Sequence, residues 1–473
     1  MPSFNFDQSF TKRDKKNAIP IRLVTRQELD RWLAGANDRQ KNWVQANNFE
    51  GASGTFIIFP DKNGQADKVL LGLGKSHDCL DSPWTFASLP KFLPTGSFRI
   101  ESKLNDHQMF QAAFGWGAAQ YEYSSYKNSA GEPKQKILIL EESVPTKKLE
   151  ALLTGITLTR DLINTPPNHM GPTALAKAAS NLARQFDAKI QITSGDDLLK
   201  ANLPLIHAVG RAAEDPPRLI DLQWGQKHAP KITLVGKGVC FDTGGLDLKS
   251  AAGMRLMKKD MGGAATVLGL AYAIMWMDLP IRLRVLIPAV ENSVAGNAYR
   301  PGDILTARNG KTIEIGNTDA EGRLVLGDAL VLADEEKPDY LIDFATLTGA
   351  ARIALGPDLP AFYTNNDAFA EDLAKFAKDH SDPLWRMPLW SGYDDDLNSK
   401  VADLNNISSS AFAGSITAAL FLQNFVSQAK TWAHFDIFGW NQKDRSGRPE
   451  GGEAMALRAI YAWLEDHFQR QAN

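Results

Sequence analysis

The spacing of apolar residues changes near residue 142, and this change divides the chain into two predicted domains. Before that point, short apolar runs alternate with loops and with two segments of helical spacing, which is typical of a small α/β domain. The predicted strands are 54–60, 68–73 and 136–140, and the predicted helices are 26–34 and 106–119. We therefore assign residues 1–142 to an N-terminal α/β domain.

A segment of mostly helical apolar spacing, residues 146–162, follows this domain and stops before Pro166-Pro167. The residue before a proline disfavours helical backbone, so the helix is expected to end there. We assign residues 143–165 to a connecting helix and residues 166–473 to a second, larger domain.

The larger domain alternates between strand-like runs and helical segments. The expected strands are 231–241, 281–290 and 340–346, and the expected helices are 173–186, 263–277, 323–336 and 413–428. Asn309-Gly310, inside the segment 303–315, is a strong signal for a β-hairpin. The alternation predicts an α/β fold with a mainly parallel sheet covered by helices on both faces.

Composition narrows the functional classes. The formal net charge of −3, without a basic cluster, argues against nucleic acid and anionic membranes as partners. The two cysteines are too few for a disulfide framework and suggest a reducing compartment. Residues 1–20 lack an apolar targeting segment, and the uncharged stretches 261–277 and 404–429 suit a buried helix and a polar-interrupted segment better than membrane spans. We expect a cytoplasmic protein.

The run NTDAEGRL at residues 317–324 carries candidate chemistry. Asp319 and Glu321 stand two positions apart on a glycine-flanked turn, and Arg323 follows two positions later. Carboxylate oxygens bind hard metal ions, and an arginine can hold an anion or a developing negative charge. A solvated loop that leads into a helix at 323–335 explains the run about equally well.

Four more candidates lie upstream, near glycines or element ends from which a side chain can point into a cavity. They are Lys237, Asp242, Lys249 and Asp260. Three of them have simple structural alternatives. Asp242 can cap a turn, Lys249 can be solvated, and Asp260 can be the N-cap of the apolar helix that follows. Because these four residues occur together with the D-x-E-x-R run, one site that they share is a simpler explanation than a separate structural role for each.

Charge favours a site with two metal ions. Asp242, Asp260, Asp319 and Glu321 would bring four negative charges together, and they could not all stay ionised without positive charge among them. Two divalent cations would supply that charge, as in two-metal hydrolases. The set contains no His and no Cys, so it is not a zinc-finger or thiolate site.

These segments resemble the leucine aminopeptidase family, the M17 cytosolic metallopeptidases. The NTDAEGRL run matches the family signature, and the upstream lysines and aspartates follow its spacing. The resemblance covers roughly residues 145–450 and is weak before residue 140. Further matching segments are 164–168, 291–292, 297–303, 345–350 and 402–406. The resemblance implies a catalytic metallopeptidase domain and a macro-domain-like N-terminal module.

The resemblance also implies two divalent metal ions, Mn²⁺ or Zn²⁺. One ion would be bound by Lys237, Asp242, Asp260 and Glu321, and the other by Asp242, Asp319 and Glu321. Lys237 would have to be a neutral amine, because an ammonium has no lone pair; nearby cations and burial lower a lysine pKa. A hydroxide that bridges the two metals would attack the scissile carbonyl.

The remaining catalytic roles are implied in the same way. Lys249 would stabilise the oxyanion, and Arg323 would hold a bicarbonate ion that acts as general base. A free α-amine can bind a metal beside the attacked carbonyl, whereas a blocked one cannot. The expected substrates are therefore short peptides with a free N-terminus, and the expected assembly is a homohexamer.

By the same resemblance, the pocket for the N-terminal residue includes Met257, Thr346, Leu347, Gly349 and Phe438. Methionine is a flexible apolar lining, so a leucine- or methionine-type residue is the expected occupant. Phe438 stands where many members have alanine, and it could shrink or reshape the pocket.

Three downstream residues also depart from the family pattern. Asn441 stands where some members have an apolar residue, and Glu450 and Glu453 add two acids. The acids either attract a cationic substrate or are solvated, and the solvated interpretation is favoured.

Two functions outside peptide hydrolysis were weighed against the aminopeptidase interpretation. Some family members also bind DNA, but the acidic balance of this chain argues against nucleic acid. A catalytically inactive scaffold is disfavoured because every matched ligand and both catalytic side chains are present.

Overall fold

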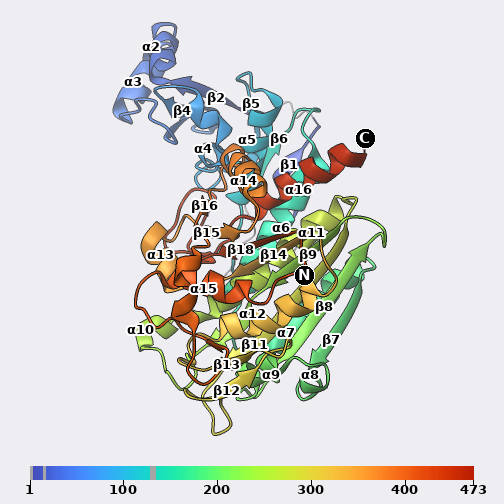
Figure 1. Ribbon diagram of the computed structural model, residues 1–473. Coiled ribbons are helices and arrows are strands. Elements are labelled where there is room, and N and C mark those ends of the chain that lie inside the picture. Colours follow the sequence, from blue (N-terminus) through green and yellow to red (C-terminus); the bar gives the residue numbers. More distant parts are fainter. Residues whose placement is uncertain (1–3, 14–16, 128–134, 473) are drawn as a thin grey trace. The chain divides into compact units, whose positions relative to one another are not determined.

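The computed structural model describes residues 4–13, 17–127 and 135–472, which form two compact units (Figure 1). The smaller unit contains the chain up to Leu153 together with Lys443–Glu450. The larger unit contains Thr154–Gln442 and the chain from Gly451 onward. The sequence expectation for residues 1–20 includes residues 1–3 and 14–16, which lie outside the described ranges. None of the described helices is both long and apolar enough to cross a membrane.

A sheet of six strands, counted over the described residues, forms the smaller unit in the order β1-β6-β5-β2-β4-β3. Only β3 is antiparallel to its neighbour. The strands are β1 (Phe10–Thr11), β2 (Ile19–Thr25), β3 (Phe56–Pro60), β4 (Ala66–Gly74), β5 (Gly96–Ile100) and β6 (Lys136–Ile139). The helices are α1 (Phe6–Ser9), α2 (Arg26–Ala34), α3 (Asp38–Ala46), the 3₁₀ helix η1 (Asp78–Asp81), α4 (Pro83–Phe86) and α5 (Asp106–Ala118).

The longer helices of this unit begin where their sequences provide caps. Thr25, Asn37 and Asn105 each accept a hydrogen bond from the backbone three residues on, and the side chain at that position bonds back. This capping box satisfies amide groups that have no partner inside the helix. The predicted α/β character of the N-terminal region is confirmed, with α2 and α5 at their expected positions.

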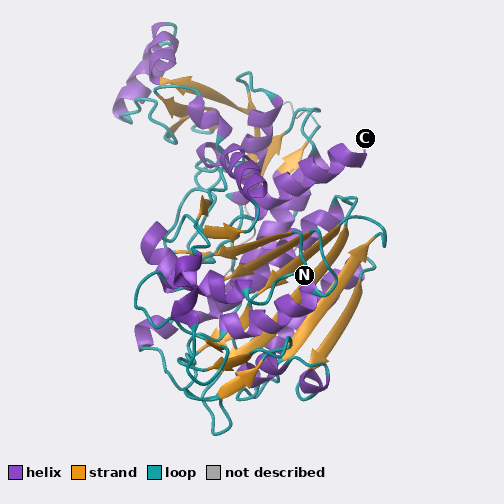
Figure 2. Cartoon of the chain, in the orientation of Figure 1, coloured by secondary structure: helices purple, strands orange, loops and turns teal. Residues whose placement is uncertain are grey.

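The larger unit contains a nine-stranded sheet within the described ranges (Figure 2). Its order is β16-β15-β18-β14-β9-β11-β8-β7, and β10 pairs with β11. Strands β9, β10, β11, β14 and β18 are mutually parallel, whereas β7, β8 and β15 join by antiparallel pairs. The strands are β7 (Lys189–Ser194), β8 (Arg218–Gly225), β9 (Lys231–Gly236), β10 (Gly238–Asp242), β11 (Arg282–Asn292), β14 (Tyr340–Ala345), β15 (Ala361–Thr364), β16 (Trp385–Arg386) and β18 (Thr431–Asp436). The mainly parallel sheet is as predicted.

Helices cover both faces of this sheet (Figure 2). Helices α9, α12 and α15 pack together on one face, and α7, α11 and α16 pack on the other. The helices are α6 (Thr146–Asn164), α7 (Pro172–Gln185), α8 (Asp197–Lys200), α9 (Pro204–Gly210), α10 (Ala251–Met254), α11 (Gly262–Trp276), α12 (Gly322–Asp334), α13 (Gly349–Leu355), α14 (Asp367–Asp379), α15 (Gly414–Gln423) and α16 (Leu457–Ala472), with 3₁₀ helices η2 (Met257–Met261) and η3 (Ser391–Leu397).

Strand β9 shows how the two faces are built. Val235 belongs to the hydrophobic core that includes α12 residues, whereas Gly236 faces α11 on the opposite face of the sheet. A Cβ on Gly236 would lie 2.6 Å from Val267 Cγ2 and 2.7 Å from Ala264 Cα. Glycine is therefore required for α11 to approach β9 this closely. The close approach holds the start of α11 beside the end of the strand.

Two elements differ from the sequence prediction. The expected strand 231–241 is two strands, because the chain changes partner at Lys237, whose amide donates to Phe344 O (2.9 Å) and whose carbonyl accepts from Ala264 N (2.9 Å). The expected helix 413–428 ends at Gln423. Beyond it, the amides of residues 427–429 donate instead to the buried carboxylate of Asp334, which draws the chain out of the helix.

The predicted hairpin is present. Strands β12 (Ile304–Thr306) and β13 (Thr312–Glu314) pair antiparallel around Gly310, which has φ +85°. Strand β13 also pairs with β17 (Leu404–Asn405), and β19 (Trp440–Asn441) pairs with β20 (Gly451–Gly452). Both cysteines are free thiols, and Cys240 is buried in β10.

Candidate active site

The candidate side chains gather at the carboxyl edge of the parallel strands. Lys237 follows β9, Asp242 ends β10, Thr346 follows β14 and Asp436 ends β18. Because these strands are parallel, their carboxyl ends lie at one edge of the sheet, where ligand sites of α/β proteins form.

The other acids come from segments that lead into helices. Asp260 lies in η2, just before α11, and Asp319 and Glu321 lie in the loop before α12. Asp260 is not the N-cap of α11: that position is Met261, without a side-chain cap. The Asp260 carboxylate is instead turned toward Lys237, and Oδ1 accepts from Thr346 Oγ1 at 2.7 Å. The helix-cap alternative for Asp260 is therefore wrong.

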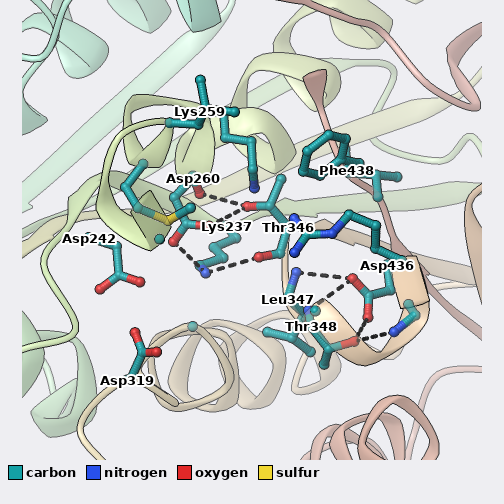
Figure 3. A pocket seen from close by; sticks show the side chains of 18 of the residues that line it. Lys237, Asp242, Lys259, Asp260, Asp319, Thr346, Leu347, Thr348, Asp436 and Phe438 are labelled. Atoms are coloured by element: carbon teal, nitrogen blue, oxygen red, sulfur yellow. Dashed lines mark hydrogen bonds and ion pairs between the residues drawn. The ribbon is translucent and has the colours of Figure 1, made fainter. Parts of the chain in front are cut away.

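Two lysines pair with the four acids. Figure 3 shows one of these pairs, Lys237 with Asp260. Lys237 Nζ lies 2.6 Å from Asp260 Oδ2 and 2.8 Å from Glu321 Oε1. Lys249 Nζ lies 2.8 Å from Asp242 Oδ2 and also pairs with Asp319. Lys249 and the acids of the NTDAEGRL loop therefore form ion pairs, and the alternative that they are solvated is wrong. Asp242 also caps a turn, as its structural alternative predicted, because its Oδ1 accepts a hydrogen bond from the Gly244 amide at 2.9 Å.

The acids fit a divalent cation. Asp242, Asp319 and Glu321 each offer a carboxylate oxygen, and these oxygens all lie within 4.8 Å of one another. Asp260 Oδ2 and Glu321 Oε1 are buried and accept no hydrogen bond of acceptable geometry from the described residues, although Lys237 Nζ is close. Buried carboxylate oxygens without hydrogen bonds are costly unless a charge compensates them. A set of oxygen donors in this state suits hard or borderline metal ions.

The electrostatics of the four acids reflect this crowding. Burial, with the charge of Asp242, raises the pKa of Glu321 to about 8 and that of Asp319 to about 6. Burial alone would lower the pKa of Lys237, but the neighbouring acids, Asp260 first, raise it above its ordinary value. The pKa of Asp260 is held below its ordinary value because Lys237 outweighs the effect of burial. Protons and lysines thus supply the positive charge that the acids require.

A network of buried polar groups fixes the site loops. Asn292 Nδ2 donates to Asp242 Oδ1 (2.9 Å) and to Thr318 O (3.0 Å), and Tyr299 Oη donates to Thr318 O (2.6 Å). Asn406 Nδ2 donates to Asn317 O at 2.7 Å. The sequence segments 291–292, 297–303 and 402–406 thus each supply a side chain that holds Asp242 or the loop before Asp319 in place.

Arg323 lies in the first turn of α12 and is 9% exposed. One guanidinium nitrogen donates to Asn406 O (2.8 Å), whereas Nε has no acceptor among the described residues. Burial lowers the pKa of Arg323 to about 10, against the charges of Glu321 and Asp436. A buried guanidinium with an unused donor can hold an anion.

Comparison with known proteins matches both parts of the chain. The model of the cytosol aminopeptidase family, catalytic domain, matches residues 157–461, and that of the M17 aminopeptidase N-terminal domain matches residues 19–139. The chain belongs to the cytosol aminopeptidase family. Membership makes it a metal-dependent aminopeptidase, a hydrolase that acts on peptides.

Full-length relatives of this cytosol aminopeptidase family support the match. A probable cytosol aminopeptidase of Chlamydia abortus is 43% identical, with 98% of this chain and 99% of that protein covered. The crystal structure of a cytosol aminopeptidase from Coxiella burnetii is 50% identical, with a TM-score of 0.92 over 98% of this chain and 100% of that one. The bottromycin maturation enzyme BotP, in complex with Mn, is 30% identical, with a TM-score of 0.85 over 95% of this chain and 99% of that one.

In this cytosol aminopeptidase the seven predicted metal-binding and catalytic side chains line one cavity of about 490 Å³, a volume typical of small-molecule sites. The five residues predicted for the substrate pocket line the same cavity: Met257, Thr346, Leu347, Gly349 and Phe438. The structure thus brings together every candidate site residue that the sequence suggested.

Three further charged residues of the cavity were not found from the sequence: Lys259, Arg352 and Asp436. Asp436 accepts hydrogen bonds from the amides of Leu347 and Thr348 (both 3.1 Å) and from Thr348 Oγ1 (2.6 Å), so it anchors the loop after β14. It lies two residues before Phe438, so its nearness in sequence to a predicted pocket residue was an available signal. Lys259 adjoins Asp260, and Arg352 stands on an exposed helix, so both look like ordinary solvated cations.

Two downstream predictions can now be compared with the structure. Glu453 is neither solvated nor open to a substrate: it is 4% exposed and pairs with Arg160 at 3.3 Å. The solvated interpretation is therefore wrong for Glu453, whereas Glu450 is exposed. His434, two residues before Asp436, is fully buried, and its Nδ1 contacts Asp343 Oδ1 at 2.5 Å, so it is a packed, hydrogen-bonded residue.

Proposed function

We propose that this aminopeptidase binds two divalent metal ions through the five side chains predicted from the sequence. Lys237, Asp242, Asp260 and Glu321 hold one ion, and Asp242, Asp319 and Glu321 hold the other. The observation that carries the proposal is the convergence of four acids on one cavity, three of which bring carboxylate oxygens within 4.8 Å of one another. The ions are Mn²⁺ or Zn²⁺, and the Mn complex of BotP supports Mn²⁺.

When bound, two such ions would acidify a water molecule and polarise the scissile carbonyl. Lys237 must give up its proton to become a ligand, and burial, which disfavours its charged form, assists this once cations neutralise the acids. Asn292 keeps Asp242 oriented throughout, because its amide holds the oxygen that Lys249 does not contact. The chain therefore presents a fixed set of ligands.

Lys249 and Arg323 carry the remaining catalytic roles in this proposal. Lys249 stabilises the oxyanion that develops on the carbonyl, since its ammonium group faces the cavity beside Asp242 and Asp319. Arg323 holds bicarbonate, which acts as general base. The buried guanidinium has no carboxylate partner among the described residues and keeps an unused donor, which supports an anion at this position.

The substrates proposed are short peptides with a free N-terminus, from which the first residue is released. Met257, Thr346, Leu347, Gly349 and Phe438 form the pocket for that residue, and its apolar part suits leucine- or methionine-type side chains. A blocked amine cannot occupy a metal position, so N-acetylated peptides are expected to be inert.

Metal-stripped protein, with Mn²⁺ or Zn²⁺ added back, tests the proposal on a panel of dipeptides in free and N-acetylated forms. Metal-dependent release of the first residue from the free forms alone is expected, with two bound ions per chain by elemental analysis. One ion per chain, or equal turnover of acetylated peptides, would refute the two-metal exopeptidase assignment. Buffer depleted of bicarbonate, compared with buffer that contains it, tests the anion at Arg323.

The proposal also includes a homohexamer in the cytoplasm and the domain assignment 1–142, 143–165 and 166–473. Light scattering tests the assembly, and a monomer would contradict it. Limited proteolysis with mass spectrometry tests the domain boundaries, because cleavage is expected between the assigned units.

A further inference from the structure

Two cations lie against the phenylalanine that distinguishes the substrate pocket. Lys259 Nζ is 5.0 Å from the centre of the Phe438 ring, and Arg352 Cζ is 4.9 Å from it. All three residues line the cavity, and Figure 3 shows Lys259 and Phe438 on the same side of it. Cation–π contact stabilises such an arrangement but leaves N–H donors of both groups free.

Lys259 is only 5% exposed, yet no described residue accepts a hydrogen bond from its ammonium group or forms an ion pair with it. Burial lowers the pKa of Lys259 to about 8, against the charges of Asp260 and Asp436. Asp260 is held by Lys237 and Thr346, and Asp436 is held by backbone amides. A buried charge without a partner is costly, so an anion that enters the pocket would relieve it.

Arg352, at the rim of the pocket, likewise has no acid to pair with among the described residues. It is exposed on α13, and no described carboxylate lies within ion-pair distance of its guanidinium. The pocket therefore combines an apolar wall, from Met257 and the Phe438 ring, with two unpaired cations beside that ring. An aliphatic stem that ends in a carboxylate matches both parts.

We infer that the pocket for the N-terminal residue, beside the apolar side chains already proposed for it, also binds acidic ones, glutamate or aspartate, through Lys259 and Arg352. The inference rests on the proposed aminopeptidase function and names a substrate class for the same site. The carboxylate of the first residue lies beside Phe438, where it accepts hydrogen bonds from both cations. A site built to bond a substrate group discriminates strongly against an analogue that lacks it.

The alternative is that the two cations only hold the Phe438 ring in place. Glutamate and glutamine have the same shape, so a purely structural role treats them alike, whereas an anion site separates them. Amino-acid p-nitroanilides are suitable probes because the first residue carries their only carboxylate. We compare kcat/KM for the Glu, Gln and Leu compounds with the metal-loaded enzyme.

Glu is expected to exceed Gln by at least about tenfold, a difference typical of one good charge-assisted contact. Lys259→Met is expected to reduce the Glu-to-Gln ratio to near one, and the exposed Arg352→Gln to reduce it in part. Lys258→Met is the matched control: this adjacent lysine donates to Asn164 O (2.8 Å) and does not line the cavity, so the ratio should be unchanged.

Free glutamate and glutamine give a readout without turnover, since calorimetry measures their binding as products. Tighter binding of glutamate, lost in Lys259→Met, supports the anion site. Equal binding and equal turnover of Glu and Gln, with Leu turned over, would overturn this inference and leave the aminopeptidase proposal intact. Absence of turnover for all three compounds would overturn both.

Discussion

Gly322 stands at the first position of α12, directly against Lys237. A Cβ at this position would lie 2.5 Å from Lys237 Cε and 2.7 Å from Nζ. Ordinary contacts between such atoms are about 3.5–4.0 Å, so Nζ must move by roughly 1 Å. Lys237 is 2% exposed and its Nζ lies 2.6 Å from Asp260, which leaves little room for that movement without loss of the pairing.

Gly322→Ala is therefore expected to displace the amine ligand while leaving the fold intact. A misplacement of about 1 Å can lower a rate by roughly 100-fold, and a loss of that order in kcat/KM is expected. Alanine favours a helix over glycine by up to about 1 kcal/mol, so the urea midpoint of the metal-free protein should change little or rise. The assay is hydrolysis of a free dipeptide during Mn²⁺ titration, beside urea unfolding followed by circular dichroism.

Gly296→Ala is the matched control, because a Cβ there would meet nothing within 4 Å. It should retain wild-type activity and metal affinity. If Gly322→Ala kept kcat/KM and Mn²⁺ affinity within about threefold of wild type, Lys237 would not be a ligand and the two-metal assignment would fail.

Two further predictions concern the same acids. Asn292→Ala removes the amide that donates to Asp242, and loss of such a supporting contact typically weakens metal binding 10–100-fold. Titration with Mn²⁺ against a chelator measures this affinity. Asn297→Ala is the control, because its amide donates to Arg211 O instead, and this variant should bind Mn²⁺ normally. The raised pKa values of Glu321 (about 8) and Asp319 (about 6) mean that the folded metal-free protein binds more protons than the unfolded chain, so its free energy of unfolding should fall as pH rises from about 4 to 8. Urea titrations at several pH values check this, and a rise in stability over that window in stripped protein would contradict the crowded-acid interpretation.

The sequence predicted the central strands because both of their faces are buried. Residues 231–241, 281–290 and 340–346 are nearly continuous apolar runs, as expected for parallel strands under helices. The pattern gave no strand at 431–436, where β18 carries the buried polar residues His434 and Asp436. Their partners come from other strands and loops, so the local sequence cannot show that they are satisfied.

The acids of the candidate site were predictable for a different reason. They lie at strand ends and in glycine-containing loops, and an acidic group crowded at such a position has few structural explanations. Lys259 and Arg352 were missed because a lysine or arginine in a sequence is usually solvated. Only the folded chain shows that one of them is buried beside Phe438 without an acid to pair with.

The charged side chains of the site pair with one another: Lys237 with Asp260 and Glu321, and Lys249 with Asp242 and Asp319. On the proposed assignment, a cation enters only by exchange, since it must displace the proton from Lys237. Ions that favour oxygen alone, such as Ca²⁺, gain little from the amine that is released, whereas transition metals bind nitrogen well. Metal choice at this site then depends on competition with a proton, and acidification would favour the empty enzyme.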